Sequence, residues 1–181
     1  PPRVKFETKY IRAAEGGVGA TKCGGNYGGS LYPAKLAQEE GYEQLIWTDA
    51  REHAYIEESG TMNVMFFIEG KLITPHVSDT TLDGVTRKSI VAVAKHWNIP
   101  VEERKVSVKE IVEALKAGKV EAAFGAGTAV VISPFASINY EGVDYTLPEI
   151  KEDSFVSKVK SYLTDLRTGK IEDVFGWTLK V

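Results

Sequence analysis

The sequence predicts a mixed α/β domain. Stretches rich in β-branched and aromatic residues, which predict strands, alternate with amphipathic stretches that predict helices, and several strands also follow one another directly. Hydrophobic residues make up 43% and charged residues 26% of the chain, as is typical of a globular protein. A length of 181 residues suits one domain with a sizeable core.

The first quarter of the chain predicts a strand, a glycine-rich loop, a helix and a second strand. Residues 4–14 are rich in β-branched and aromatic side chains, and a loop follows at 15–29. Residues 30–41 predict a short helix, in which Pro33 fits only the first turn. Residues 43–48 predict the next strand.

A meander of short strands is predicted next, followed by a helix. The strands are expected at 53–59, 62–70 and 71–75, with Gly70 at one turn. Apolar residues then recur at helical spacing over 84–98. The central part of the chain is therefore expected to contribute several neighbouring strands and one amphipathic helix.

The second half predicts a capped helix, two apolar strands and a closing helix. Ser107 and Glu110 form the pattern of a capping box at the start of a helix over 107–119. Residues 120–134 predict two apolar strands around a glycine turn. Residues 153–170 predict a closing amphipathic helix.

Charge and cysteine content exclude several classes of function. The net charge of −3 gives no sign of binding to nucleic acid or to an anionic membrane, and neither a bilayer-spanning stretch nor a secretory signal is present. A single cysteine, Cys23, excludes an intrachain disulfide and fits the cytoplasm. The histidines have no metal-ligand spacing and are interpreted as structural or surface residues: His53, His76 and His96.

A single lysine, Lys22, lies in the glycine-rich stretch "TKCGGNYGGS" at residues 21–30. One interpretation is a solvated lysine on a flexible loop. The other is a reactive amine at a place where a ligand must approach the backbone closely, which glycine permits.

Two adjacent carboxylates, Glu57 and Glu58, lie in "YIEESGTMN". In a strand they point to opposite faces, so one can be solvated while the other faces inward. A buried carboxylate needs a cationic partner. The alternative is a pair of exposed acids on an edge strand.

Two further stretches offer backbone N–H groups to an anion. The helix expected at 84–98 begins with Gly84 and Thr86 in "LDGVTR", and helix N-termini bind phosphate. Gly127 and Thr128 in "FGAGTAVV" form a similar glycine turn. The alternatives are an ordinary capped helix and a tight turn between buried strands.

Taken in chain order, these features describe a cofactor site. An amine that forms a Schiff base, a carboxylate that keeps a ring nitrogen protonated and two anion-binding turns would together bind pyridoxal 5′-phosphate.

The chain resembles the C-terminal, larger domain of branched-chain-amino-acid aminotransferases, which are fold type IV pyridoxal-phosphate enzymes. The matching stretches are "KCGGNYGGSL", "IEESGTMNVMF", "TLDGVTRKSI" and "FGAGTAVV", in the family's order. The resemblance implies a C-terminal pseudo-barrel domain of the D-amino-acid-aminotransferase-like fold, formed by residues 1–181. It also implies a smaller N-terminal domain, absent from this chain, which brings a phosphate-binding arginine.

The resemblance implies individual roles. Lys22 is implied to form the Schiff base and to move the proton between Cα and C4′, Tyr27 to hydrogen-bond the phenolic oxygen, and Glu58 to pair with the pyridine nitrogen. Leu82 is implied to pack on the cofactor ring. The implied cofactor-binding residues are Lys22, Tyr27, Glu58, Thr61, Leu82, Val85, Thr86 and Thr128. The implied substrate-binding residues are Gly127, Thr128 and Ala129.

The implied activity is transfer of the amino group of Leu, Ile or Val to 2-oxoglutarate by a full-length, homodimeric, cytoplasmic transaminase. Its partners are branched-chain amino acids, 2-oxo acids and the N-terminal domain, and the isolated domain is expected to be inactive. Two alternatives stay open: another fold type IV enzyme, either a D-amino-acid aminotransferase or an aminodeoxychorismate lyase, or a catalytically silent α/β binding domain.

Overall fold

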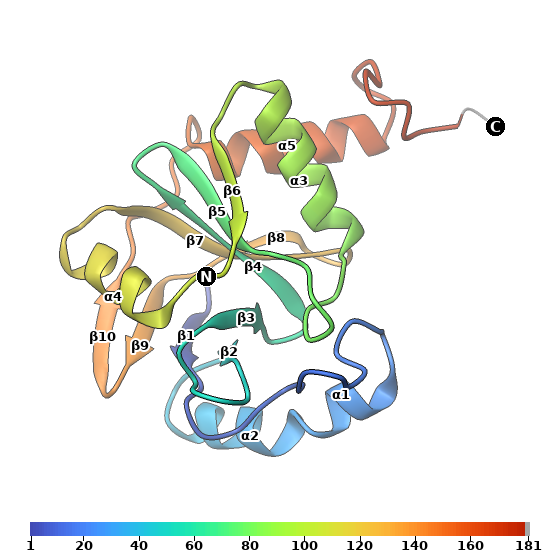
Figure 1. Cartoon of the computed structure of the whole chain (residues 1–181). Coiled ribbons are helices and arrows are strands. Elements are labelled where there is room, and N and C mark those ends of the chain that lie inside the picture. The colour runs from blue at the N-terminus through green and yellow to red at the C-terminus, as the bar shows by residue number, and fades with distance from the viewer. Residues whose placement is uncertain (180–181) are drawn as a thin grey trace.

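A computed structural model describes residues 1–179 and shows one branched sheet of ten strands with helices around it (Figure 1). The strands are β1 (Arg3–Phe6), β2 (Gln44–Thr48), β3 (Ile56–Ser59), β4 (Met62–Ile68), β5 (Lys71–Pro75), β6 (Val101–Arg104), β7 (Val120–Gly127), β8 (Val131–Pro134), β9 (Ser137–Tyr140) and β10 (Val143–Thr146). The helices are α1 (Gly24–Gly28), α2 (Leu31–Glu39), α3 (Val85–His96), α4 (Val108–Lys116) and α5 (Phe155–Arg167). The predicted mixed α/β class is confirmed.

The sheet branches at β4. One path runs in the order β10-β9-β1-β2-β3-β4-β5-β6, while β7 also pairs with β4 and carries β8. Asn63 of β4 pairs with both Glu58 of β3 and Ala126 of β7, and Phe66 pairs with both β5 and β7. Because a strand has only two edges, β3 and β5 share the edge opposite β7. This branching brings the ends of β3, β4 and β7 together.

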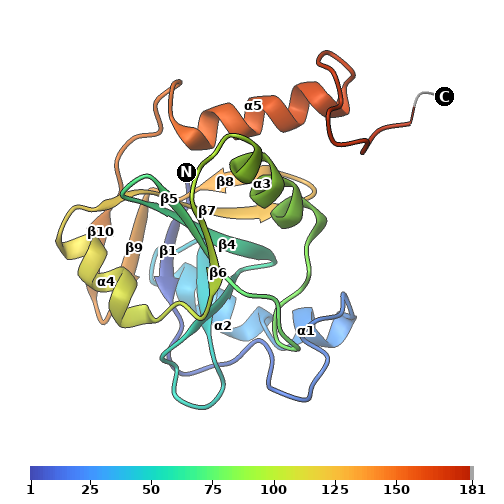
Figure 2. The same cartoon turned by 45° about the horizontal axis from the view of Figure 1, so that its top comes forward.

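Helices cover the sheet on different sides, with separate apolar clusters between them. Residues of α4 pack with Val64 and Phe66 of β4, whereas α3 and α5 pack with Met65 of β4. Figure 2 shows α4 and the α3–α5 pair on different sides of the sheet, with α1 and α2 at a third position. Strand β4 is therefore buried on both faces, which explains its continuous apolar run "VMFFI".

Most predicted elements are confirmed with shorter bounds. Helix α2 carries Pro33 in its first turn and is followed by Gly41 at a φ of 88°, and α4 is followed by Gly118 at 64°. The Ser107 hydroxyl accepts the N–H of Glu110 at 3.0 Å. The Glu110 carboxylate pairs with Arg104, so it does not serve the capping box in the way its position suggests.

Three predictions about elements are wrong or incomplete. The strand expected at 4–14 ends at Phe6, because the Glu7 carboxylate accepts the N–H groups of Lys9 and Tyr10 and turns the chain. The loop expected at 15–29 contains the short helix α1. The sequence analysis also missed β6 and the β9–β10 hairpin, which turns at Glu141 and Gly142 with φ values of 49° and 80°.

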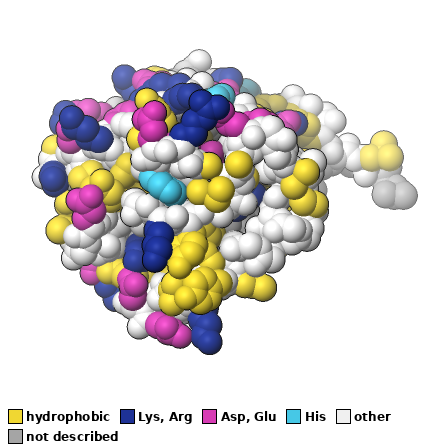
Figure 3. Space-filling view, turned by 60° about the horizontal axis from the view of Figure 1, so that its bottom comes forward, with side chains coloured by type: hydrophobic (Ala, Val, Ile, Leu, Met, Phe, Trp, Pro, Cys, Tyr) yellow, Lys and Arg dark blue, Asp and Glu magenta, His cyan; other side chains and the backbone are white. Residues whose placement is uncertain are grey.

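The surface carries no basic stripe on the face shown in Figure 3, where positive and negative side chains alternate with apolar ones. Within residues 1–179, no helix is both long enough and apolar enough to cross a membrane. In the same part of the chain, no group of His, Cys, Asp or Glu side chains is placed to hold a metal ion.

Candidate functional site

A cavity of about 700 Å³ lies between the N-terminus of α3 and the ends of β3, β4 and β7. It brings together residues from all four stretches that the sequence analysis singled out. They are Lys22, Glu58, Thr61, Leu82, Gly84, Val85, Thr86, Gly127, Thr128 and Ala129. Segments that are far apart in the sequence thus meet at one place, because β4 pairs with both β3 and β7.

Lys22 lies just before α1 and is exposed to solvent. The turn around it is fixed by buried Asn26, whose amide donates to the backbone oxygens of Val18 and Thr21 at 2.9 and 2.8 Å. A Cβ added to Gly24, Gly25 or Gly28 would meet nothing within 4 Å. The space beside this lysine is therefore open, and the lysine is exposed as the simpler interpretation expects, although a short helix follows it directly.

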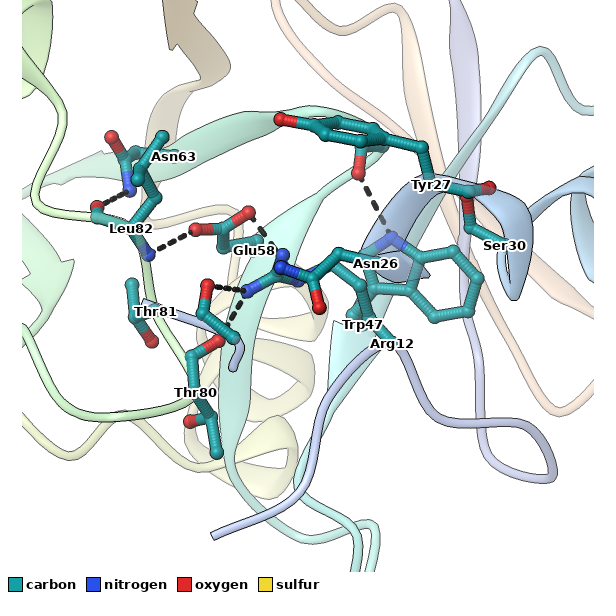
Figure 4. A network of polar contacts seen from close by, with 12 residues as sticks. Arg12, Asn26, Tyr27, Ser30, Trp47, Glu58, Asn63, Thr80, Thr81 and Leu82 are labelled. Atoms are coloured by element: carbon teal, nitrogen blue, oxygen red, sulfur yellow. Dashed lines mark hydrogen bonds and ion pairs between the residues drawn. The ribbon is translucent and has the colours of Figure 1, made fainter. Parts of the chain in front are cut away.

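Tyr27 is the one predicted site residue that does not line the cavity. It lies half-buried in α1. Figure 4 shows its ring extending from α1 toward the side on which Glu58 and Asn63 lie.

Glu58 is the buried acid of the site, with 3% of its surface exposed. Its Oε1 accepts the N–H of Leu82 at 2.6 Å, and its Oε2 lies 3.4 Å from the Arg12 Nε (Figure 4). Burial raises the pKa of Glu58 to about 7, although Arg12 and the Leu82 N–H both oppose the shift. At neutral pH this carboxyl therefore binds and releases a proton readily.

Arg12 is the cationic partner that a buried carboxylate needs. Its side chain is 6% exposed, and its guanidinium also donates to the backbone oxygens of Gly19, at 3.2 Å, and Thr80. The sequence analysis did not identify this residue, because its stretch was predicted to be a strand. Only the folding of 7–21 as a loop against 79–80 brings the guanidinium to Glu58.

Glu57 points to the opposite side of β3, as strand alternation predicts. It lines a second cavity of about 370 Å³ together with His76 and Asp79. The expectation that one acid of the pair is solvated is nevertheless wrong, since Glu57 is only 8% exposed and its Oε2 has no hydrogen-bond partner among residues 1–179. Burial raises the pKa of Glu57 as well. The alternative of two exposed edge-strand acids is also wrong.

The N-terminus of α3 faces the cavity through Gly84, Val85 and Thr86. Gly84 is the N-cap residue, with a φ of −67° and a ψ of 132°, and has no side chain that could cap the helix. The N–H groups of a first turn have no partner within the helix, so they stay available to an anion. The helix is thus capped without a side chain, and an ordinary capped helix stays the alternative interpretation.

The turn between β7 and β8 places Gly127, Thr128 and Ala129 at the cavity. The segment is the tight turn that the alternative interpretation predicted, because Gly127 pairs with Val131 across it. Thr128 and Ala129, at the tip of the turn, are exposed to solvent. The side chain of Met62 lies over this strand. A Cβ at Gly125 would come within 2.5 Å of the Met62 Cε, and one at Gly127 within 3.2 Å of the Met62 Cγ. These two glycines therefore make room for Met62.

Known proteins resemble this chain in sequence and in fold. The family described as Amino-transferase class IV matches residues 8–138. Branched-chain-amino-acid aminotransferase 2 of Bacillus subtilis (strain 168) is 38% identical over 181 residues, which are 100% of this chain and 50% of that protein. The probable branched-chain-amino-acid aminotransferase of Staphylococcus aureus (strain N315) is 40% identical over 181 residues, 100% of this chain and 51% of that protein. The chain thus spans about half the length of the curated relatives it matches.

Solved structures show the same fold. The branched-chain amino acid aminotransferase from Escherichia coli superposes with a TM-score of 0.79 at 29% identity, over 97% of this chain and 56% of that one. The branched-chain amino acid aminotransferase from Thermobaculum terrenum, in its PLP-form (holo-form), has a TM-score of 0.79 at 22% identity, over 94% of this chain and 52% of that one. The predicted fold type IV architecture is confirmed by these likenesses.

Proposed function

Because the chain belongs to the class IV aminotransferase family, we propose that it carries the pyridoxal 5′-phosphate site of a branched-chain-amino-acid aminotransferase. One observation supports this most strongly: an amine, a buried carboxylate and an uncapped helix N-terminus line the same cavity. These residues are Lys22, Glu58 and Gly84 with the first turn of α3.

The residues present fit this cofactor chemically. A carboxylate that is buried and linked to only one arginine suits a protonated ring nitrogen, which adds a second positive charge. The free N–H groups at the start of α3 and the Thr86 hydroxyl suit a phosphate. When bound, pyridoxal 5′-phosphate supplies a carbonyl carbon that accepts an amino group and a ring that takes up electrons from the substrate.

Each side chain then has a defined task. The Lys22 Nζ attaches the cofactor and carries a proton to and from the substrate carbon. Glu58 holds the proton on the ring nitrogen, and Arg12 keeps Glu58 in place. Tyr27 would donate its hydroxyl to the phenolic oxygen, Leu82 would pack on the ring, and Thr61 would also bind the cofactor. Val85, Thr86 and Thr128 bind the phosphate.

Substrate binding is assigned to the turn between β7 and β8. Its sequence from Phe124 to Pro134 contains neither Lys nor Arg, so the backbone N–H groups of Thr128 and Ala129 are the donors for the substrate carboxylate. We propose Leu, Ile and Val as amino donors and 2-oxoglutarate as acceptor. An amino-donor panel on the full-length enzyme tests this, and a preference for D-amino acids would contradict it.

We expect Gly127→Val to raise the KM of both donor and acceptor by about tenfold or more, because hydrogen bonds to a charged group contribute about 1.5–3 kcal/mol. The valine side chain enters the cavity edge that leads to the Thr128 and Ala129 amides. Steady-state kinetics with both substrates measures the effect.

Gly125→Ala is the matched control for Gly127→Val. It also displaces Met62, whose Cε would lie 2.5 Å from the new Cβ, but Gly125 does not line the cavity. We expect the KM values of Gly125→Ala to change much less. Equal effects of the two variants would show that Met62 is responsible, and unchanged KM values in Gly127→Val would contradict the assignment of the turn.

We further propose that residues 1–181 are the C-terminal domain of a longer, homodimeric, cytoplasmic enzyme. The exposure of Lys22, Thr128 and Ala129, and of 75% of Val85, supports this, because catalysis of this kind needs a site from which water is excluded. The rest of the enzyme would cover these residues and supply an arginine for the phosphate.

The chain alone is therefore expected to transaminate Leu with 2-oxoglutarate at a small fraction of the rate of the full-length enzyme. An open site weakens each electrostatic contact, and a phosphate without its arginine loses a charge-assisted hydrogen bond. The assay compares the chain with a protein in which the N-terminal domain is restored. Comparable rates in the two proteins would contradict this account of the site.

A further inference from the structure

Two residues opposite each other in the sheet hold the two sides of one loop residue. Glu58 of β3 pairs directly with Asn63 of β4, so their side chains share one face. The Leu82 N–H donates to the Glu58 Oε1 at 2.6 Å, and the Asn63 Nδ2 donates to the Leu82 oxygen at 2.8 Å (Figure 4). The backbone of Leu82 is thus fixed from both sides by the β3–β4 pair.

The same asparagine explains why residue 84 is a glycine. The φ of Gly84 is −67°, which any residue adopts, so backbone conformation does not require glycine here. A Cβ at this position would lie 2.1 Å from the Asn63 Oδ1. Asn63 is 5% exposed and lines the cavity, and its hydrogen bond to the Leu82 oxygen holds its side chain in this position. Its side chain therefore lies directly against the residue that precedes α3.

This contact lies at the start of α3, where Gly84 has no side chain that could cap the helix. The Leu82 oxygen also accepts the Gly84 N–H at 2.8 Å, so the segment 82–84 forms a tight connection between the asparagine and the helix. A displacement of Leu82 would move both the N–H that reaches Glu58 and the first turn of α3.

We infer that Asn63 is a positioning residue that sets the distance between the Glu58 carboxylate and the anion-binding N-terminus of α3. This inference rests on the proposed function, in which a single rigid ligand contacts both places through its ring nitrogen and its phosphate. Such a ligand binds well only if the two places are held at the correct separation.

The test compares Asn63→Ala with Asn139→Ala in the full-length protein. Asn139 is a matched control, since it is 4% exposed and donates its Nδ2 to the Asp144 Oδ1 at 2.8 Å, in the β9–β10 hairpin outside the cavity. The probes are pyridoxal 5′-phosphate and pyridoxal, which lacks the phosphate. Their dissociation constants are measured by absorption.

Asn63→Ala is expected to reduce the advantage of pyridoxal 5′-phosphate over pyridoxal about tenfold, which corresponds to about 1.4 kcal/mol. Asn139→Ala is expected to leave the ratio of the two dissociation constants unchanged. A role in stability alone would weaken both probes equally, so an unchanged ratio in Asn63→Ala would overturn the inference. Asn63→Leu keeps a side chain of similar size, removes the donor without adding a charge, and replaces the alanine variant if that variant does not fold.

Two cofactor-free measurements separate failure of this inference from failure of the proposed function. Amide hydrogen exchange over 82–86 is expected to accelerate in Asn63→Ala but not in Asn139→Ala. Gly84→Ala is expected to lower thermal stability less in the Asn63→Ala background, because the Cβ no longer meets Oδ1. Unchanged exchange, or additive effects, would overturn the inference even if the cofactor binds. If the wild-type protein binds neither probe, the proposed function is wrong.

Discussion

Lys22→Ala in the full-length enzyme is expected to abolish covalent attachment of pyridoxal 5′-phosphate and to lower kcat by about 10³-fold or more. The reason is that the amine both anchors the cofactor and moves the proton at the substrate carbon. In the described part of the chain, Lys22 is the only lysine or arginine that lines the cavity of about 700 Å³.

Borohydride reduction of the cofactor-loaded protein, followed by peptide mass mapping, measures the attachment directly. The pyridoxyl adduct is expected on Lys22 in the wild type and on no residue in Lys22→Ala. Lys35→Ala is the control, because Lys35 is an exposed lysine of α2 that does not line the cavity. An adduct on Lys35 or Lys71 in the wild type would contradict the assignment.

The sequence was sufficient to predict most of the residues that meet at the candidate site, because they lie within short stretches that follow one another in a fixed order. Lys22, Glu58, Gly84 and Thr128 are each flanked by residues with a local signature, either glycines, a strand end or a helix start. A local signature predicts the geometry of its own stretch. The order of the four stretches along the chain predicted that they belong to one site. The cavity that contains all four is formed by strand pairing, which the sequence does not state.

Residues that act through long-range contacts were not predictable in the same way. Arg12 reaches Glu58 only because the chain leaves the sheet after Phe6, and nothing in "YIRAAE" distinguishes it from a surface arginine. Met62 and Gly125 contact each other through the pairing of β4 with β7. The burial of Glu57 likewise depends on the loops at 49–55 and 75–81, which close over that face of β3.

The short strands were missed for a related reason. Strand β6 has the sequence "VEER", which has weak strand propensity, and it forms because it pairs in parallel with β5. In β9 and β10, the exposed and polar positions weaken the apolar alternation that would predict a strand. Tertiary pairing therefore decides these elements, whereas capping and glycine signals suffice for α2 and α4.

Glu58→Gln is expected to lower kcat by about 10³-fold, because an amide cannot hold the ring proton by charge. Its pH dependence gives a sharper test. The pKa of Glu58 is raised to about 7 in the cofactor-free protein, so the carboxyl is mostly ionised above pH 7 and mostly protonated below it. The proposed complex keeps one proton between Glu58 and the ring nitrogen.

The direction in which the cofactor affinity changes with pH follows from counting protons. Above pH 7 the free carboxyl has lost its proton, so binding to the wild type takes up one more proton than binding to Glu58→Gln, and the affinity advantage of the wild type falls as the pH rises. Below pH 7 the carboxyl already carries the proton, so the contribution of Glu58 to the pH dependence of the affinity disappears. Cofactor titrations from pH 6 to 9 measure the slope, and calorimetry in buffers of different ionisation enthalpy measures the proton uptake. The lysine amine, the phosphate and the ring nitrogen of the free cofactor also titrate, but they contribute equally to wild type and variant.

The difference between wild type and Glu58→Gln therefore isolates the Glu58 proton, and it is expected to approach one proton at high pH. Glu57→Gln is the matched control on the opposite face of β3. Its pKa is also raised by burial, but it lines the other cavity, so kcat and the proton uptake should stay close to the wild-type values. If Glu57→Gln instead removed the proton uptake and the turnover while Glu58→Gln kept both, the register of β3 in this account would be wrong by one residue.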